Sequence, residues 1–177
     1  RLLNVCDDGT ICGIRDKAIL ALMMGCGLRR TEVVELAYAN WNQTEGTLTL
    51  IGKGNKERRV YLPDDLQGAL ADWAARRGDK AGPMFWRLKL GSGNLFEEVG
   101  LHPGSVYRLL KERSGLANLG GVTPHDLRRT FATRMLESGC DLFLLQRAMG
   151  HASVTTTARY DRRTEKSREK VCRGLRF

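Results

Sequence analysis

Hydrophobic residues recur at helical spacing through most of the chain. Within residues 13–24, Ile14, Ala18 and Leu22 fall on one stripe, with further apolar residues beside it, and this pattern predicts a helix. Pro, Ser or Asp residues at the starts and Gly residues at the ends mark further helices. The predicted further helices are 29–36, 63–77, 105–114, 124–138, 141–149, 153–160 and 163–173.

Two short stretches follow the alternation typical of strands. Thr47–Ile51 and Arg58–Leu62 are rich in β-branched residues, and residues 52–56 (GKGNK) between them suit a turn, so we expect a β-hairpin. The Gly- and Pro-containing residues 78–103 are expected to be mostly loop, with a short strand near Met84–Trp86. We therefore predict a mainly α (α+β) fold with a small antiparallel β-sheet, formed as one domain.

The charge balance of the chain favours a polyanionic partner. Lys and Arg number 29 against 20 Asp and Glu, a formal net charge of +9, and such an excess attracts DNA because neutralised phosphates release counterions. A basic soluble protein without a nucleic-acid partner has the same charge. The five cysteines are scattered without metal-ligand spacing, which favours reduced thiols in the cytoplasm. The most apolar run is far too short to cross a membrane.

Five short motifs follow one another in an order that suggests chemistry. They are 27–32 (GLRRTE), 52–56 (GKGNK), 125–128 (HDLR), 150–151 (GH) and 159–160 (RY). With these motifs, nearly the whole chain resembles the catalytic domain of the tyrosine recombinase, or phage integrase, family. The resemblance implies an active site made of Arg29, Lys53, His125, Arg128, His151 and Tyr160.

Strand cleavage by this site is expected to rest on charge stabilisation around one phosphate. Arg29 and Arg128 keep their positive charge and offer planar forks of donors to phosphate oxygens. His151 can donate a further hydrogen bond to a non-bridging oxygen. We expect no metal ion and no other cofactor in such a site.

Tyr160 is the nucleophile that the resemblance implies. A phenol has a pKa of about 10 and must lose its proton during attack. His125 is the expected base, directly or through water, and Lys53 is the expected acid for the leaving 5′-oxygen. The product is a phosphotyrosine that keeps the bond energy, so a 5′-hydroxyl can reseal the strand without ATP.

Taken singly, each of these residues has an ordinary structural explanation. Arg29 can form a helix-terminal ion pair with Glu32, His151 can cap a helix, and Tyr160 can be a core aromatic residue. Six chemically complementary residues in the family's order favour the catalytic interpretation. In the resemblance, Glu32 is a neighbour that orients Arg29.

Other residues are assigned by charge or position alone. We interpret His102 as a loop residue and Cys26 as a packing residue. Thr155–Thr157 are interpreted as packing residues of a short helix before Tyr160, with contact between a hydroxyl and phosphate as the alternative. The helix 105–114 is the expected major-groove element. The expected DNA contacts outside the active site are Lys56, Arg58, Arg59, Tyr107, Arg108, Lys111, Arg113, Arg129 and Arg134.

The family's architecture adds expectations about assembly. Its members carry an N-terminal helical domain that clamps DNA and has no counterpart in residues 1–177, so we expect weak DNA binding by this chain alone, as a monomer. They also pass a C-terminal helix to a neighbour in a tetramer on double-stranded DNA, which residues 163–177 could supply. A type IB topoisomerase and a DNA-binding regulator without catalysis are the alternative functions.

Overall fold

The chain forms two compact units, residues 1–131 and 132–177. The boundary between them lies inside helix α5 (Pro124–Glu137). The structure is a computed structural model, which describes residues 1–52, 56–89, 96–161, 169 and 172–174. No helix in this part of the chain is long and apolar enough to span a bilayer.

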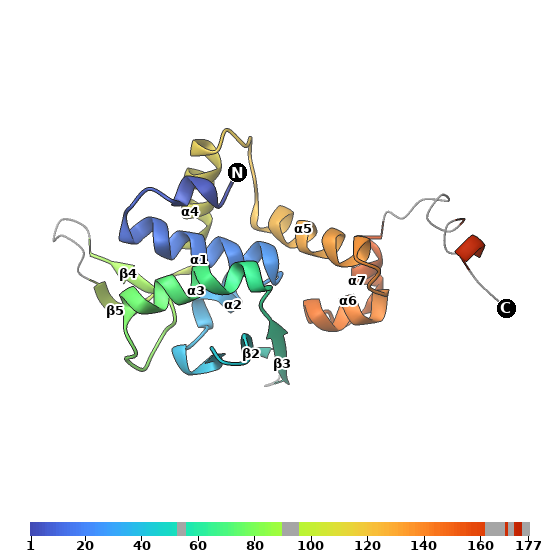
Figure 1. Ribbon diagram of the computed structural model, residues 1–177, viewed down its shortest axis with the longest axis horizontal. Coiled ribbons are helices and arrows are strands. Elements are labelled where there is room, and N and C mark those ends of the chain that lie inside the picture. The colour runs from blue at the N-terminus through green and yellow to red at the C-terminus, as the bar shows by residue number, and fades with distance from the viewer. Residues whose placement is uncertain (53–55, 90–95, 162–168, 170–171, 175–177) are drawn as a thin grey trace. The chain divides into compact units, whose positions relative to one another are not determined.

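The first unit is mainly helical, with two small antiparallel sheets at its periphery (Figure 1). Besides the start of α5, its helices are η1 (Asn4–Cys6), α1 (Ile11–Gly25), α2 (Arg30–Glu35), η2 (Tyr38–Asn40), α3 (Asp64–Arg77) and α4 (Pro103–Leu116). Its strands are β1 (Trp41–Asn42), β2 (Thr47–Gly52), β3 (Lys56–Tyr61), β4 (Trp86–Leu88) and β5 (Phe96–Gly100). The predicted mainly α fold with small antiparallel sheets is thus confirmed.

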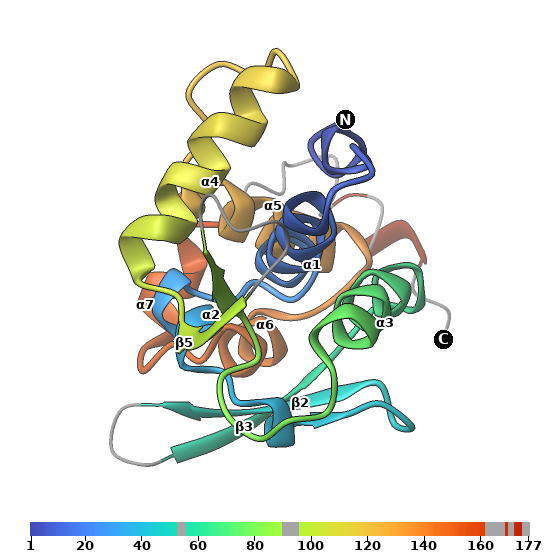
Figure 2. The same ribbon diagram turned by 90° about the vertical axis from the view of Figure 1, so that its left-hand side faces the viewer.

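Helix α1 forms the centre of the first unit. Thr10 caps its start by accepting a hydrogen bond from the backbone N–H of Gly13 at 2.9 Å, as side-chain oxygens do at helix starts. Every residue from Ala18 to Met23 is almost completely buried. The sequence predicted one apolar stripe, but α2, α3 and α4 all pack on this helix, with α3 and α4 on different sides in Figure 2. Burial from several directions requires apolar residues all round.

The hairpin predicted between residues 47 and 62 is confirmed. Strands β2 and β3 pair antiparallel, from Thr47 opposite Tyr61 to Gly52 opposite Lys56. Strand β1 adds to the other edge of β2, which the sequence pattern did not predict because β1 has only two residues.

The expectation of a mostly irregular segment at 78–103 was partly wrong. Strand β4 lies two residues later than the strand expected there, and it pairs with β5. Met84 and Phe85, which suggested the strand, are instead buried in the core. There the Met84 carbonyl accepts a hydrogen bond from the Trp73 indole at 2.9 Å, so these apolar residues mark core packing rather than the strand itself.

The second unit contains the end of α5, α6 (Leu142–Met149) and α7 (Val154–Ala158). Helix α6 begins as predicted, because the Asp141 carboxylate accepts from the backbone N–H groups of Phe143 and Leu144, each at 2.8 Å. It ends at Gly150, whose φ of 59° is left-handed, a conformation that favours glycine. Helix α6 packs against α7.

Helix α7 is shorter than predicted. Ser153 caps it as expected, but the helix ends at Ala158, and Tyr160 follows in a turn. Residues 162–168 and most of the remaining C-terminus lie outside the described residues, so the helix predicted at 163–173 stays a prediction.

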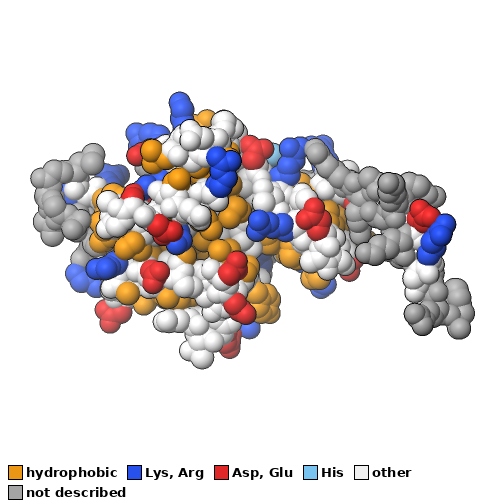
Figure 3. Space-filling model, turned by 45° about the horizontal axis from the view of Figure 1, so that its top comes forward, with side chains coloured by type: hydrophobic (Ala, Val, Ile, Leu, Met, Phe, Trp, Pro, Cys, Tyr) orange, Lys and Arg blue, Asp and Glu red, His pale blue; other side chains and the backbone are white. Residues whose placement is uncertain are grey.

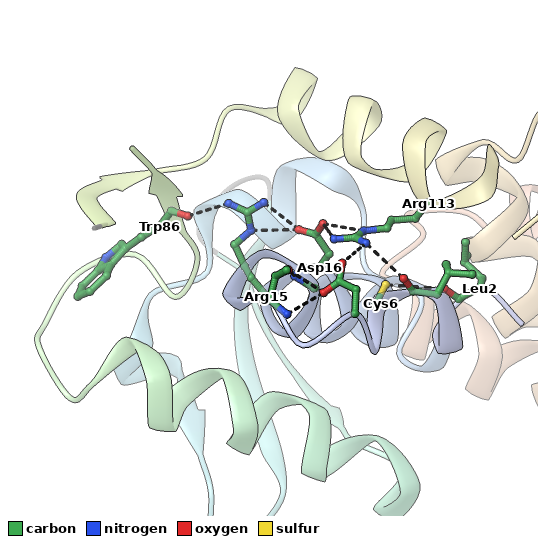
Figure 4. A network of polar contacts seen from close by, with 10 residues as sticks. Leu2, Cys6, Arg15, Asp16, Trp86 and Arg113 are labelled. Carbon is green, nitrogen blue, oxygen red and sulfur yellow. Dashed lines mark hydrogen bonds and ion pairs between the residues drawn. The ribbon is translucent and has the colours of Figure 1, made fainter. Parts of the chain in front are cut away.

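Arg113 belongs to a network of charges in the first unit, in which Arg113 and Asp16 are buried. Its guanidinium donates to Asp16 at 3.0 Å and to Asp8 at 2.7 Å, and Arg15 pairs with the other oxygen of Asp16. Figure 4 shows the Asp16 carboxylate between the two guanidinium groups. Arg113 is only 5 % exposed. The expectation that Arg113 neutralises DNA was therefore wrong, because its charge is compensated inside the fold.

Candidate active site

The first group of candidate residues surrounds the carboxylate of Glu32 at the start of α2. Arg29 is the N-cap of this helix, and its backbone N–H donates to Glu32 Oε2 at 2.7 Å. The Arg29 guanidinium donates to Glu32 Oε1, also at 2.7 Å. One carboxylate thus holds both the backbone and the side chain of Arg29, an arrangement that fixes the position of the arginine.

Arg58, from strand β3, completes the set of donors around Glu32. Its two terminal nitrogens donate to Glu32 Oε1 at 2.7 Å and Oε2 at 3.0 Å, the bidentate geometry that guanidinium favours. Burial alone would raise the pKa of Glu32, but the hydrogen bonds from Arg58 and Arg29 outweigh it and lower the pKa to about 2. Glu32 is therefore an anion at neutral pH.

The structure gives Arg58 an internal partner, whereas the sequence suggested a DNA contact. Its side chain is 15 % exposed, and a contact with DNA stays a prediction. The alternation along β3 indicates this internal position of Arg58, because Arg58 shares the inward face with buried Val60 while Arg59 and Tyr61 are exposed.

Arg128 reaches the loop that carries Arg29. Its guanidinium is buried and donates to the backbone carbonyl of Gly27, two residues before Arg29. Gly27 has a φ of 65°, and a Cβ there would lie 2.4 Å from the ring of Phe131. Only glycine suits both the left-handed turn and this close approach. Two candidate catalytic arginines therefore meet at one loop of the first unit.

His125 lies at the start of α5, as its position after Pro124 suggested. The helix start is closed by Thr123 and Asp126: the backbone N–H and hydroxyl of Thr123 donate to the Asp126 carboxylate at 2.9 and 2.6 Å. These hydrogen bonds lower the pKa of Asp126. His125 itself is exposed. It is accessible to a substrate, while Arg128, one turn later, is buried.

The second group of candidate residues lies in the second unit. His151 follows Gly150 at the end of α6, and its ring stacks on that of Tyr160, with centroids 6.1 Å apart and planes at 14°. His151 Nδ1 lies 2.9 Å from the hydroxyl oxygen of Thr157. Tyr160 is 8 % exposed, and its backbone N–H donates to the Thr157 carbonyl at 2.9 Å. The expected histidine and nucleophile are therefore neighbours.

Several assignments differ from expectation or lie beyond the described residues. Lys53 and the side chain of Lys56 are not among the described residues. His102 is not merely a loop residue, since its Nδ1 caps α4 by accepting from Gly104 N–H at 3.1 Å. Cys26 is a packing residue as expected, and burial raises the pKa of its thiol to about 12. Of the three threonines before Tyr160, Thr157 alone is buried.

The exposed basic side chains form a separate set. On the face drawn in Figure 3, they alternate with acidic and apolar ones. Arg30, which the sequence interpretation did not single out, lies over the Tyr107 ring at 6.0 Å, within range of a cation–π contact. The exposed residues from the predicted DNA contacts are Arg59, Tyr107, Arg108, Lys111, Arg129 and Arg134.

Comparison with known proteins places the chain in a family. The model of the phage integrase family matches residues 1–167. The chain belongs to this family. Tyrosine recombinase XerA of Pyrococcus furiosus is 38 % identical over 154 residues, which are 86 % of this chain and 52 % of the relative. Tyrosine recombinase XerD of Neisseria meningitidis serogroup A is 35 % identical over 163 residues, 90 % of this chain and 54 % of the relative.

Solved structures of family members share the fold of the chain. A crystal structure of XerA recombinase superposes with a TM-score of 0.77 at 24 % identity, over 99 % of this chain and 63 % of that one. The XerH site-specific recombinase, in a post-cleavage complex with its palindromic difH substrate, gives 0.75 at 25 % identity, over 97 % and 49 %. This phage integrase family member thus spans about half the length of the curated relatives it matches.

Proposed function

We propose that the chain is the catalytic part of a site-specific DNA recombinase that cleaves and rejoins strands through Tyr160. The contact between His151 and Tyr160 carries this proposal: their rings stack 6.1 Å apart, and both residues stand in the order that family members use. Relatives named tyrosine recombinases support it, and so does the XerH complex with its DNA substrate.

In the proposed reaction, the Tyr160 oxygen attacks a backbone phosphorus and displaces the 5′-oxygen of the next nucleotide. The phenol proton passes to His125, directly or through water, and Lys53 protonates the leaving oxygen. A new phosphotyrosine ester replaces the broken phosphodiester. Reversal by a 5′-hydroxyl restores the strand and returns the proton to Tyr160, so no nucleotide is hydrolysed.

Positive charge around the phosphate supplies the stabilisation. Arg29 and Arg128 meet at the loop that follows α1, where two guanidinium groups can face the oxygens that gain charge during attack. Glu32 and Arg58 hold Arg29 in place. His151 donates to a non-bridging oxygen. The proposal requires that these residues and Tyr160 converge on one phosphate when DNA is bound.

Double-stranded DNA is the proposed substrate, and exchange between two sites requires a tetramer with one protomer on each half-site. Residues 163–177 are the segment proposed to pass to a neighbouring protomer. A type IB topoisomerase would use the same ester chemistry without exchanging partners. Relaxation of supercoiled plasmid without recombination between two target sites would favour the topoisomerase.

The decisive test is trapping of the covalent adduct. The chain would be incubated with a pool of nicked double-stranded oligonucleotides of varied sequence and run on a denaturing gel. We expect an adduct with the wild type, its loss in Tyr160→Phe, and its retention in Tyr61→Phe, which removes the hydroxyl of an exposed tyrosine. An adduct that persists in Tyr160→Phe would rule out this nucleophile, and a wild type that forms none would contradict the proposed activity.

A further inference from the structure

Thr157 contacts both members of the His151–Tyr160 pair. Its hydroxyl lies 2.9 Å from Nδ1 of His151, and its main-chain carbonyl accepts the backbone N–H of Tyr160 at 2.9 Å. Its side chain is completely buried. One residue of α7 therefore joins the histidine after α6 to the tyrosine after α7, inside a single compact unit.

Burial decides the direction of the hydrogen bond between Thr157 and His151. A hydroxyl proton that is removed from water needs an acceptor, and leaving it without one costs about 1–3 kcal/mol. Within the described part of the chain, His151 Nδ1 is the hydrogen-bond partner of this hydroxyl. If Nδ1 carried the proton and donated it, the Thr157 hydroxyl proton would have no acceptor there. The favoured arrangement has Thr157 as donor and Nδ1 as acceptor.

A neutral imidazole that accepts at Nδ1 carries its proton on Nε2. We propose that Thr157 is a positioning residue that holds His151 in the Nε2–H tautomer and keeps its ring beside Tyr160. This inference rests on the proposed function, in which His151 donates to a phosphate oxygen. It adds the reason why the donor proton stands on Nε2, where a neutral His151 can offer it to DNA.

The tautomer can be measured without any DNA reaction. Long-range ¹H–¹⁵N NMR spectra of the ¹⁵N-labelled chain distinguish a protonated from an unprotonated ring nitrogen, with His151→Gln identifying the signals. We expect the Nε2–H pattern for His151 in the wild type and in Thr157→Ser, which keeps the hydroxyl. Thr157→Val, of nearly the same shape, should give a mixture of tautomers, whereas Thr156→Val, at an exposed position of the same helix, should not.

Adduct formation provides the second measurement. We expect Thr157→Val to slow single-turnover formation of the tyrosyl–DNA adduct by about 10- to 100-fold, the loss typical when a residue that orients an active-site group is removed. DNA affinity should change less than threefold, and Thr157→Ser should recover most of the rate. If the role of Thr157 were purely structural, folded Thr157→Val and the folded wild type would form the adduct at the same rate.

The two measurements separate the inference from the proposed function. A wild-type His151 with its proton on Nδ1, or a tautomer unchanged in Thr157→Val, overturns the inference whatever the activity. Should Thr157→Val fail to fold, the wild-type tautomer and the rate of Thr157→Ser still test the inference. A tenfold loss of rate in Thr157→Ser would contradict the inference, because this variant keeps the hydroxyl. A wild type with the Nε2–H tautomer but no adduct contradicts the proposed function and leaves the tautomer assignment standing.

Discussion

The carboxylate of Glu32 accepts two hydrogen bonds from the guanidinium of Arg58, at 2.7 and 3.0 Å. The two residues are 26 positions apart, on α2 and β3. Glu32 also holds Arg29, so Arg58 acts on this candidate catalytic arginine through the carboxylate between them. The β2–β3 hairpin thus supports the position of Arg29.

Replacing Arg58 tests this support. Arg58→Met keeps much of the side-chain length but leaves the Glu32 charge with Arg29 alone, and removal of one partner from a largely buried ion pair destabilises by about 2–4 kcal/mol. Arg58→Lys should recover part of the loss, because an ammonium supplies the charge but no planar fork. Urea unfolding monitored by circular dichroism measures both.

Arg59 provides the matched control on the same strand. It is exposed, and it pairs with Glu45 at 3.6 Å, a type of surface contact worth about 0–1 kcal/mol. Arg59→Met should therefore leave the unfolding midpoint nearly unchanged. Equal effects of the Arg58 and Arg59 substitutions would show that the Glu32 pairing does not stabilise the fold.

The pKa of Glu32 predicts a specific loss of stability in acid. Its ordinary value of 4.5 is lowered to about 2 in the folded chain, so the folded state holds fewer protons than the unfolded state between these values. The contribution is fully present above pH 4.5 and is lost as the pH falls toward 2. In Glu32→Gln the free energy of unfolding should be lower at pH 6 and should fall less steeply below pH 4.5.

Urea unfolding at several pH values between 2.5 and 6 measures the two curves. The pKa of Asp8 is also lowered to about 2, because the hydrogen bonds from Thr10 and Arg113 outweigh the opposing effect of burial. The free energy of unfolding of both proteins therefore keeps some dependence on pH. The expected result is that the curves approach each other toward pH 2.5. Parallel curves would mean that Glu32 is not the anion that Arg29 and Arg58 share.

Gly27 is expected to tolerate no side chain. In Gly27→Ala the methyl group meets the Phe131 ring in a left-handed backbone conformation, and strain and crowding together should cost about 2–4 kcal/mol. Gly121 also has a positive φ, of 56°, but has open space where a Cβ would lie. Gly121→Ala should therefore show only the backbone strain, about 1 kcal/mol. Thermal unfolding of both variants compares them, and equal losses would refute the contact with Phe131.

Sequence patterns predicted most helices because caps and periodicity are local. Asp141 and Gly150 bound α6 where expected, and the chemistry of the 52–56 turn gave the hairpin. The short strand β1 and the pairing of β4 with β5 were missed, because each depends on a partner that local composition does not reveal.

In the candidate site too, local sequence patterns identified some residues but not the contacts that depend on folding. Arg29, Arg128 and His151 were identified by motif, since their type and order are visible in the chain. The contacts made by Arg58 and Thr157 were missed because each depends on a residue brought close by folding or by a turn. Arg113 was misassigned for the same reason, because its charge alone does not reveal that Asp16 lies beside it.

Helix α4 offers a final test, in which two of its cations should behave in opposite ways. Lys111 is exposed, whereas Arg113 is buried against Asp16 and Asp8. If α4 lies on DNA as expected from the sequence, Lys111→Ala should weaken binding to all sequences and reduce the slope of log affinity against log salt by about 1. It should leave stability unchanged. Arg113→Met should leave that slope unchanged but lower the free energy of unfolding by about 2–4 kcal/mol, because the buried Asp16 carboxylate loses one of its two arginine partners and Asp8 loses its hydrogen bond from Arg113. Fluorescence-anisotropy titrations at several salt concentrations, paired with urea unfolding, measure both quantities for both variants. A slope that changes in Arg113→Met but not in Lys111→Ala would contradict this assignment, because the DNA-facing charge of α4 would then be Arg113 and not Lys111.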